Sequence, residues 1–363
     1  MPSICLNMIV KNEAVNIGRL FDSVKDFIDY FVIVDTGSTD NTRELIEDFK
    51  KKVPGELHQM EWKNFGWNRS ESIKLTKGKA DFLLLLDADD TIHINHMNIF
   101  KEKLNGDGYY IHHNGGLDYT LPRLVNAKHD WRFTGVTHEY ITCPVPYTFT
   151  NQRDLTITHH ADGGCRSDKF TRDIELLEHG INEEPLNSRY YFYLAQSYKD
   201  VGNWDKAAAM YLKRAEMGGW NEEVYYCYYQ LVRAAIYFGK TNNQNTESIM
   251  LQYLMEGFKI NPLRAEALYE VIRFYRMSEQ YHKALPFASH GLTVTYPFTQ
   301  NLFIEKTIYD WKLLDEISIV QYWVAQYDNC KRTCTKLLRD GNLPTSQVER
   351  VLSHIKYCDE KLK

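Results

Sequence analysis

One stretch constrains the fold of this chain more than any other, the run from Phe82 to Asp90. Five apolar residues, Phe82–Leu86, are followed by three carboxylates within four positions, Asp87, Asp89 and Asp90. The length suits a strand that is buried on both faces of a parallel sheet. Periodicity alone does not separate such a strand from a buried helix, but the abrupt polar end favours a strand.

The acids at the end of this run indicate a ligand site. Open α/β sheets bind ligands at the carboxyl edge, which is where the acids would lie. Closely spaced carboxylates repel one another, and a cation relieves that repulsion. Their oxygens suit Mg²⁺ or Mn²⁺ held together with substrate phosphates. The alternative is a solvated acidic turn, because acidic triplets of this kind are common by chance.

Strand-like and helix-like segments alternate before this run. The apolar patterns predict strands at 4–10, 31–34 and 57–62 and helices at 14–27, 43–51 and 68–77. Such alternation predicts an α/β fold with a mostly parallel sheet and helices on both faces. Glu13 and Asp35 follow two of these strands, so parallel strands would bring them to the same edge as Asp87. This convergence favours a binding site more strongly than any single acid does.

The composition argues against several classes of protein. The formal net charge is −5 and there is no long basic block, so nucleic acid is not expected as the main partner. Neither a Gly-x-Gly-x-x-Gly nor a Gly-x-x-x-x-Gly-Lys-Ser/Thr motif occurs, so dinucleotide-binding and P-loop interpretations lose their usual support. No apolar stretch has the length of a transmembrane helix, and the first residues do not resemble a signal peptide.

The cysteine pattern bears on the compartment. The seven cysteines are scattered and include no Cys-x-x-Cys pair. This pattern predicts reduced thiols and a cytoplasmic protein. Cys330 and Cys334 could share one helix face as a metal pair, but ordinary packing is the favoured interpretation.

Four segments of the first half together resemble the signatures of family 2 glycosyltransferases, which have a GT-A fold. They are 9–13 (Ile-Val-Lys-Asn-Glu), 34–42 (Val-Asp-Thr-Gly-Ser-Thr-Asp-Asn-Thr), 65–70 (Phe-Gly-Trp-Asn-Arg-Ser) and 87–90 (Asp-Ala-Asp-Asp). Order, spacing and placement at strand ends agree with the family. In the third segment Arg69 matches, whereas Ser70 stands where the family usually has Asn, so only the arginine is carried over. The resemblance covers roughly residues 1–165.

The resemblance implies a nucleotide-sugar donor, with a UDP-sugar favoured. By analogy, the backbone near Ile9 and Val10 lines the base pocket. Glu13 and Asp35 accept hydrogen bonds from the ribose hydroxyls or the base N–H, and Asp87 lies beside the ribose and the sugar. The structural alternatives are a turn cap for Asp35 and a helix-start acid, favoured by the helix dipole, for Glu13.

The resemblance also implies a metal that holds the diphosphate. Asp89 is the expected ligand, and Arg69 is expected to offset the leaving-group charge together with the metal. The alternative for Arg69 is a surface residue of a helix. GT-A enzymes often complete the metal site with a late histidine, and His159 lies in the matching place, with His160 as the alternative. Imidazole suits Mn²⁺ better than Mg²⁺.

The general base is expected after the strand-like segment 131–136. There, an aromatic-x-Gly stretch resembles the family segment that leads to an acid, which takes the acceptor proton in inverting members. Glu139 is the candidate, with His138 helping to shape the site. The alternative for Glu139 is a structural salt bridge. The following polar segment, 161–168, is either a lid over the donor or a linker.

From residue 169 onward the pattern is helical and resembles tetratricopeptide repeats. One repeat spans 191–211 and another spans 268–288, although neither has the full consensus. The sequence therefore predicts a GT-A domain at 1–165 and a TPR-like helical domain at 166–363. Bacterial and viral sugar transferases, including peptide glycosyltransferases, have a similar arrangement. The helical half would then bind an acceptor or form a homodimer.

The sequence as a whole predicts a metal-dependent, inverting glycosyltransferase that moves a sugar from a UDP-sugar to a glycan or to a protein or peptide. Two alternatives stay open. The same fold could transfer sugar to a lipid phosphate, although basic amphipathic helices that would hold it at a membrane are missing. The chain could also be a helical-repeat scaffold with a degenerate transferase domain, although the acids and Arg69 are intact.

Overall fold

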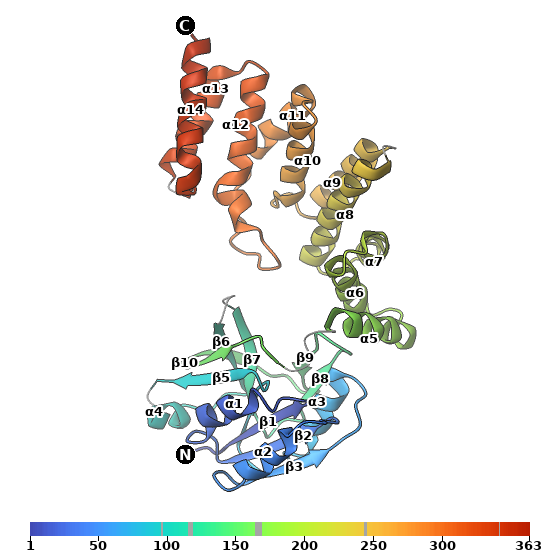
Figure 1. The fold of residues 1–363 in the computed structure, drawn as a ribbon, viewed down its shortest axis with the longest axis vertical. Helices are drawn as coiled ribbons and strands as arrows, with labels where there is room; N and C mark the ends of the chain where they lie inside the picture. The colour runs from blue at the N-terminus through green and yellow to red at the C-terminus, as the bar shows by residue number, and fades with distance from the viewer. Residues whose placement is uncertain (96, 115–118, 164–168, 243–244, 341) are drawn as a thin grey trace. The chain divides into compact units, whose positions relative to one another are not determined.

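The computed structural model describes residues 1–95, 97–114, 119–163, 169–242, 245–340 and 342–363. The chain forms two compact units, Met1–Glu184 and Pro185–Lys363 (Figure 1). The boundary expected between residues 165 and 166 lies outside the described residues.

The first unit is built on an eight-stranded sheet in the order β3-β2-β1-β4-β7-β6-β10-β5. The strands are β1 (Ile4–Val10), β2 (Tyr30–Asp35), β3 (Gly55–Gln59), β4 (Phe82–Leu85), β5 (Asp90–Ile94), β6 (Gly108–Asn114), β7 (Tyr119–Asn126) and β10 (Phe149–His159). The pairs within β1–β4 and the pair of β6 and β10 are parallel, whereas β7 is antiparallel to both of its neighbours and β5 is antiparallel to β10. The predicted α/β class with a mostly parallel sheet is confirmed.

Helices cover the sheet on both faces, and a small second sheet lies beside it. The helices of this unit are α1 (Ile17–Val24), α2 (Thr42–Phe49), α3 (Phe65–Lys74), α4 (Met97–Glu102) and α5 (Lys169–Glu183). The small sheet pairs β8 (Arg132–Thr134) with β9 (Tyr140–Thr142). Strand β8 lies within the segment 131–136, which the sequence predicts to be strand-like.

Strand β4 is buried on both faces, as its sequence predicts. Leu84 packs into the core cluster that contains the apolar residues of α1 and α2. Leu83 and Leu85 point the other way, into the cluster that contains Ile73 of α3. Because neighbouring residues of a strand face opposite sides, an unbroken apolar run is what two covered faces require.

Two predicted element boundaries differ near the end of β3. The third strand ends at Gln59 rather than at residue 62, and α3 begins at Phe65 rather than at residue 68. The reason for the early start is Asn64, whose side chain accepts a hydrogen bond from the Trp67 N–H at 2.7 Å and so caps the helix. Trp62 is thereby left in the connection between strand and helix.

The first turn of α3 packs closely against the connection after β8. A Cβ atom on Gly66 would come within 2.2 Å of the backbone oxygen of Gly135. Ser70, which stands where the resembled family has Asn, accepts a hydrogen bond from the Phe133 N–H at 2.9 Å. These contacts fix the segment that leads to Glu139 onto the helix that carries Arg69.

We expect Gly66→Ala to destabilise the first unit by about 1–3 kcal/mol, because the added methyl group has no room beside the backbone of Gly135. Thermal unfolding of the variant should show a loss of several degrees in Tm. Gly18→Ala is the control, since nothing lies within 4 Å of its new Cβ and alanine favours helix α1. Equal melting of the two variants would contradict the close packing.

The second unit consists of helices, and its consecutive helices pack in pairs. They are α6 (Ser188–Asp200), α7 (Trp204–Glu216), α8 (Asn221–Asn242), α9 (Thr246–Ile260), α10 (Glu266–Met277), α11 (Tyr281–Gly291), the π-helical turn η1 (Ile308–Lys312), α12 (Leu313–Trp323), α13 (Tyr327–Arg339) and α14 (Thr345–Lys361). Repeat positions such as Ala207, Tyr211, Ala284 and Ala288 are buried. The predicted TPR-like helical domain is confirmed.

The second unit buries aromatic and cysteine side chains. Tyr225, Tyr226 and Tyr229 of α8 are buried. Cys330 and Cys334 are buried in the core cluster of the last helices, together with Cys358. Among the described residues of the whole chain, no helix is both long and apolar enough to cross a membrane.

Candidate active site

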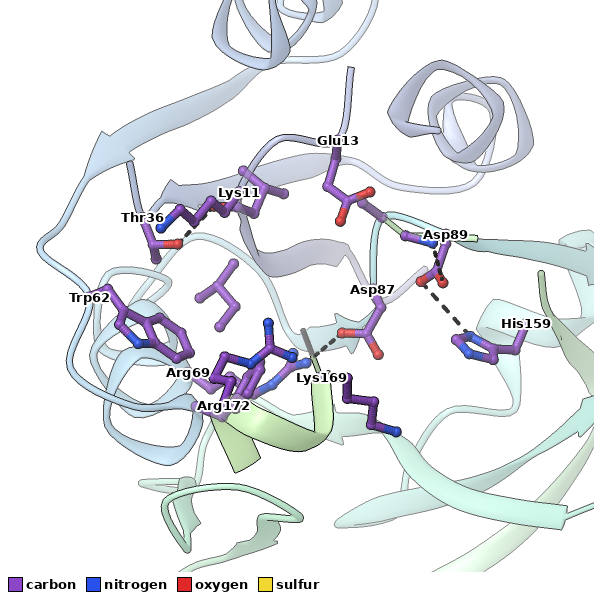
Figure 2. A pocket seen from close by; sticks show the side chains of 15 residues that line it. Lys11, Glu13, Thr36, Trp62, Arg69, Asp87, Asp89, His159, Lys169 and Arg172 are labelled. Carbon is purple, nitrogen blue, oxygen red and sulfur yellow. Dashed lines mark hydrogen bonds and ion pairs between the residues drawn. The ribbon is translucent and has the colours of Figure 1, made fainter. Parts of the chain in front are cut away.

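A cavity of about 380 Å³ opens where β1, β2 and β4 end (Figure 2). It brings together residues that the sequence placed far apart. The predicted site residues that line it are Ile9, Val10, Glu13, Arg69, Asp87, Asp89 and His159. Two further predicted residues, Asp35 and Glu139, are not among its lining residues in the described part of the chain.

A row of alternating charges includes two residues that line this cavity, Arg69 and Asp87. Arg69 hydrogen-bonds to Asp87, and its Nε lies 2.8 Å from Oε1 of Glu139. Arg123, on β7, donates from Nη2 to Oδ2 of Asp87 at 3.1 Å. The row therefore joins Glu139, Arg69, Asp87 and Arg123, and its two arginines balance its two carboxylates.

The charges in this row stabilise one another. Burial opposes the ionised form of Asp87, but Arg69 and Arg123 outweigh it and hold the pKa of this carboxyl well below its usual range. For Arg69, burial favours loss of the charge, but Asp87 and Glu139 raise the pKa of the guanidinium above its usual value. Asp87 and Arg69 are therefore both charged at neutral pH.

A candidate metal site lies at the other side of the cavity, where Figure 2 shows Asp89 and His159 facing each other. Asp89, Asp90 and His159 each offer one ligand atom, and these atoms lie within 4.8 Å of one another. His159 Nδ1 is 2.8 Å from Oδ1 of Asp90 and 3.9 Å from Oδ1 of Asp89. Two carboxylates and one imidazole form a donor set that fits Mn²⁺.

The two histidines at the end of β10 have different partners. The ring of His159 meets the carboxylates, whereas the Nε2 of His160 lies 3.0 Å from the hydroxyl oxygen of Thr91. The backbone N–H of His160 donates to the backbone oxygen of Asp89. This geometry favours His159 over His160 as the third ligand, and it adds Asp90, which the sequence did not assign.

Asp35 occupies a turn beside the main cavity. Its carboxylate accepts hydrogen bonds from the backbone N–H groups of Gly37 and Ser38, at 3.1 and 3.0 Å. It lines a separate smaller cavity, together with Arg43 and Gln59. The turn-cap interpretation therefore describes the contacts of Asp35, and a role in donor binding stays a prediction.

The chain after β10 passes beside Asp89 and Glu13. The backbone N–H of Gly163 donates to Oδ2 of Asp89 at 3.2 Å, and a Cβ at this position would lie 3.4 Å from Oε1 of Glu13. Asp162 forms an ion pair with Arg19 at 2.7 Å, which lowers the pKa of Asp162. The part of the expected lid or linker from 164 to 168 lies outside the described residues.

Several lining residues were not predicted as site residues. They include Lys11, Thr36, Trp62, Phe65, Lys169 and Arg172. The aromatic cluster around residue 65 is visible in the sequence, but the pattern does not tell which ring faces the cavity. Lys169 and Arg172 lie on α5, which the sequence assigned to the helical half.

Helix α5 is anchored to the site by a buried acid. Asp173 is 2% exposed, and its Oδ1 accepts a hydrogen bond from the Thr137 hydroxyl at 3.1 Å. Its Oδ2 lies 3.8 Å from Nε2 of His138. These contacts hold the first turns of α5 against the segment before Glu139 and place Arg172 at the cavity.

His113, on β6, is fully buried and should make stability depend on pH. Burial, reinforced by the charge of Arg123, lowers the pKa of His113 to about 4. Between about pH 4 and the model-peptide value of about 6.5, the unfolded chain binds a proton that the folded chain excludes. The contribution of His113 to the free energy of unfolding is therefore at its full value above that window. It falls by about 1–3 kcal/mol as the pH is lowered through the window.

Unfolding of a His113→Asn variant in urea, measured between pH 4.5 and pH 7.5, tests this effect. The variant should lose this part of the pH dependence. His179→Asn is the control, because the His179 side chain is 66% exposed. If the free energy of unfolding of the His113 variant depends on pH as it does in the wild type, His113 is not the source of this pH dependence.

Comparisons with known proteins bear on the family of the first unit. Residues 5–171 match the family model described as Glycosyl transferase family 2. The SPbeta prophage-derived glycosyltransferase SunS of Bacillus subtilis is 24% identical over 233 residues, which cover 59% of this chain and 53% of that protein. An uncharacterized glycosyltransferase of Rickettsia felis is 26% identical over 235 residues, which cover 61% of this chain and 77% of that protein. The chain thus spans about half the length of SunS.

Solved structures show similarity at a lower level. The crystal structure of S. aureus TarS 1–349 in complex with UDP-GlcNAc aligns with a TM-score of 0.37 and 13% identity, over 72% of this chain and 90% of that chain. The TPR protein TTC0263 of Thermus thermophilus aligns with a TM-score of 0.35 and 14% identity, over 52% of this chain and 91% of that chain.

Proposed function

We propose that this chain, whose residues 5–171 match the family 2 glycosyltransferase model, transfers a sugar from a nucleoside-diphosphate sugar with inversion at the anomeric carbon. The favoured donor is a UDP-sugar, and the acceptor is a glycan, a protein or a peptide. The observation that carries the proposal is the meeting of Arg69, Asp87, Asp89 and His159 in one cavity.

Both sides of the cavity suit the negative charge of the diphosphate in such a donor. Asp89 and His159, with Asp90, would hold a divalent metal, for which Mn²⁺ is favoured by the imidazole. When bound, that metal would neutralise the diphosphate and stabilise it as a leaving group. Lys169 and Arg172 add positive charge to the lining. Asp87, which also lines the cavity, is the proposed acceptor of hydrogen bonds from the ribose or the sugar.

Glu139 is the proposed general base, and its ion pair with Arg69 is part of the proposal. Arg69 contacts both Glu139 and Asp87, so it connects the donor side of the site to the base. A diphosphate in the cavity would compete for the Arg69 guanidinium. The weakened ion pair would leave the Glu139 carboxylate able to accept the acceptor proton.

Calorimetric titration of UDP in the presence and absence of Mn²⁺ tests donor binding. Mass spectrometry of products, after a panel of nucleotide sugars is offered with glycan, peptide and lipid-phosphate acceptors, then tests transfer. Metal-dependent UDP binding together with a glycosylated product supports the proposal. Absence of both would support a scaffold with a degenerate domain, and a glycolipid product would redirect the acceptor assignment.

The helical unit is the proposed holder of the acceptor. Its buried repeat positions build a stacked framework of the kind that presents extended binding surfaces. A homodimer formed through the same helices is the alternative. Light scattering of the full chain with and without acceptor would distinguish the two, because only dimerisation doubles the mass before acceptor is added.

A further inference from the structure

One end of the cavity is aromatic. Trp62 lies in the connection between β3 and α3 and lines the cavity, as does Phe65 at the start of α3. Their ring centroids are 4.8 Å apart and the rings are nearly perpendicular. Both side chains are only partly buried. An aromatic ring that borders a cavity in this way offers apolar surface to a ligand.

A cation from another element adds to this end. The guanidinium of Arg172, on α5, lies 5.2 Å from the centroid of the Phe65 ring. Because Asp173 fixes α5 to Thr137, the position of Arg172 is set by the fold and not by a chance surface contact. Trp62, Phe65 and Arg172 are called the aromatic end below.

The opposite end of the same cavity carries the candidate metal ligands. In Figure 2, Trp62 lies at the left beside Thr36, whereas Asp89 and His159 lie at the right, with Arg69 and Asp87 between them. A metal held at the right would bind the diphosphate of a nucleotide donor. The nucleoside must then extend away from the metal, and the other end of the cavity is the aromatic one.

We propose that Trp62 stacks on the nucleobase of the donor and is the main determinant of nucleotide affinity at this end of the cavity. This inference rests on the proposed function, since it requires a nucleotide donor. Stacking suits any base, because every base has a π-face. The aromatic end therefore supplies affinity, and the choice between bases depends on hydrogen bonds made elsewhere.

A packing role for Trp62 is the alternative, and another tryptophan serves as a matched control. Trp67 lies on α3, is 38% exposed, and is not among the lining residues of the cavity. If Trp62 only packed against Phe65, its loss would affect stability and all ligands alike. If it stacks on a base, its loss affects only ligands that carry a base.

The test uses the full chain with Mn²⁺ and two probes, UDP and inorganic pyrophosphate, measured by calorimetry. Trp62→Leu keeps apolar volume but removes the aromatic face, and it should weaken UDP binding about 5- to 100-fold. Pyrophosphate affinity should stay within about 2-fold of wild type, because pyrophosphate has no base to stack. Trp62→Phe should retain most of the UDP affinity, and Trp67→Leu should match wild type for both probes.

The outcomes separate this inference from the proposed function. Unchanged UDP affinity in Trp62→Leu would overturn the inference while leaving the proposed function intact. Equal loss of UDP and pyrophosphate affinity would also overturn it, because it would indicate local collapse. Failure of the wild-type protein to bind any of UDP, ADP, GDP and CDP with Mn²⁺ would remove the proposed function, and the inference with it.

Discussion

Asp89→Ala is expected to abolish sugar transfer and to make UDP affinity insensitive to Mn²⁺. Asp89 is one of three side chains whose ligand atoms lie within 4.8 Å of one another, and the other two are Asp90 and His159. Loss of one carboxylate removes both a ligand and a negative charge. Electrostatic help from a metal is worth several kcal/mol, so kcat should fall by about 10³-fold or more.

The measurement combines kcat with titration of UDP at several Mn²⁺ concentrations. Asp154→Ala is the control, because Asp154 lies on the same strand as His159 but pairs with the exposed Lys103. It should behave as wild type. Full activity in excess EDTA would contradict the metal assignment. So would an Asp89→Ala variant whose UDP affinity still depends on Mn²⁺.

Glu139→Gln should separate chemistry from binding. The amide keeps the shape of the side chain and loses its basicity, and general-base catalysis is typically worth about 10²- to 10⁴-fold. We therefore expect kcat to collapse while UDP and Mn²⁺ bind almost normally. Melting temperature must be measured on the same preparation, since Glu139 also forms an ion pair with the mostly buried Arg69.

A purely structural role for Glu139 gives another pattern. Breaking a buried ion pair on one side leaves a charge without its partner, which lowers stability. Turnover would then fall only in proportion to the folded fraction. Glu71→Gln is the control, because Glu71 pairs with the exposed Lys74 on the same helix as Arg69. It should change neither turnover nor melting.

Near-normal kcat in Glu139→Gln would move the base elsewhere. Asp162 is the next acid along the chain near the site, but it is engaged by Arg19, which lowers its pKa and makes it a weaker base. The double variant Glu139→Gln, Asp162→Asn would then test whether either acid takes the proton.

The sequence by itself determined the class of the first unit and the place of its site. Strand β1 has the predicted bounds, and β4 is buried on both faces as its apolar run requires. Parallel strands end at one edge of the sheet. The alternation of strands and helices therefore predicts that Glu13, Asp87 and Asp89 lie together at that edge. These features depend on local periodicity, which a single sequence displays.

The tertiary structure alone decided which side chains face one another. It paired Arg69 with Glu139, turned His159 rather than His160 toward the acids, and assembled Trp62, Phe65 and Arg172 at one end of the cavity. Asp173 shows why, since its buried contact with Thr137 joins residues 36 positions apart and so places α5 beside the cavity. Contacts of this kind depend on packing between segments that are distant in the sequence, so local periodicity does not predict them.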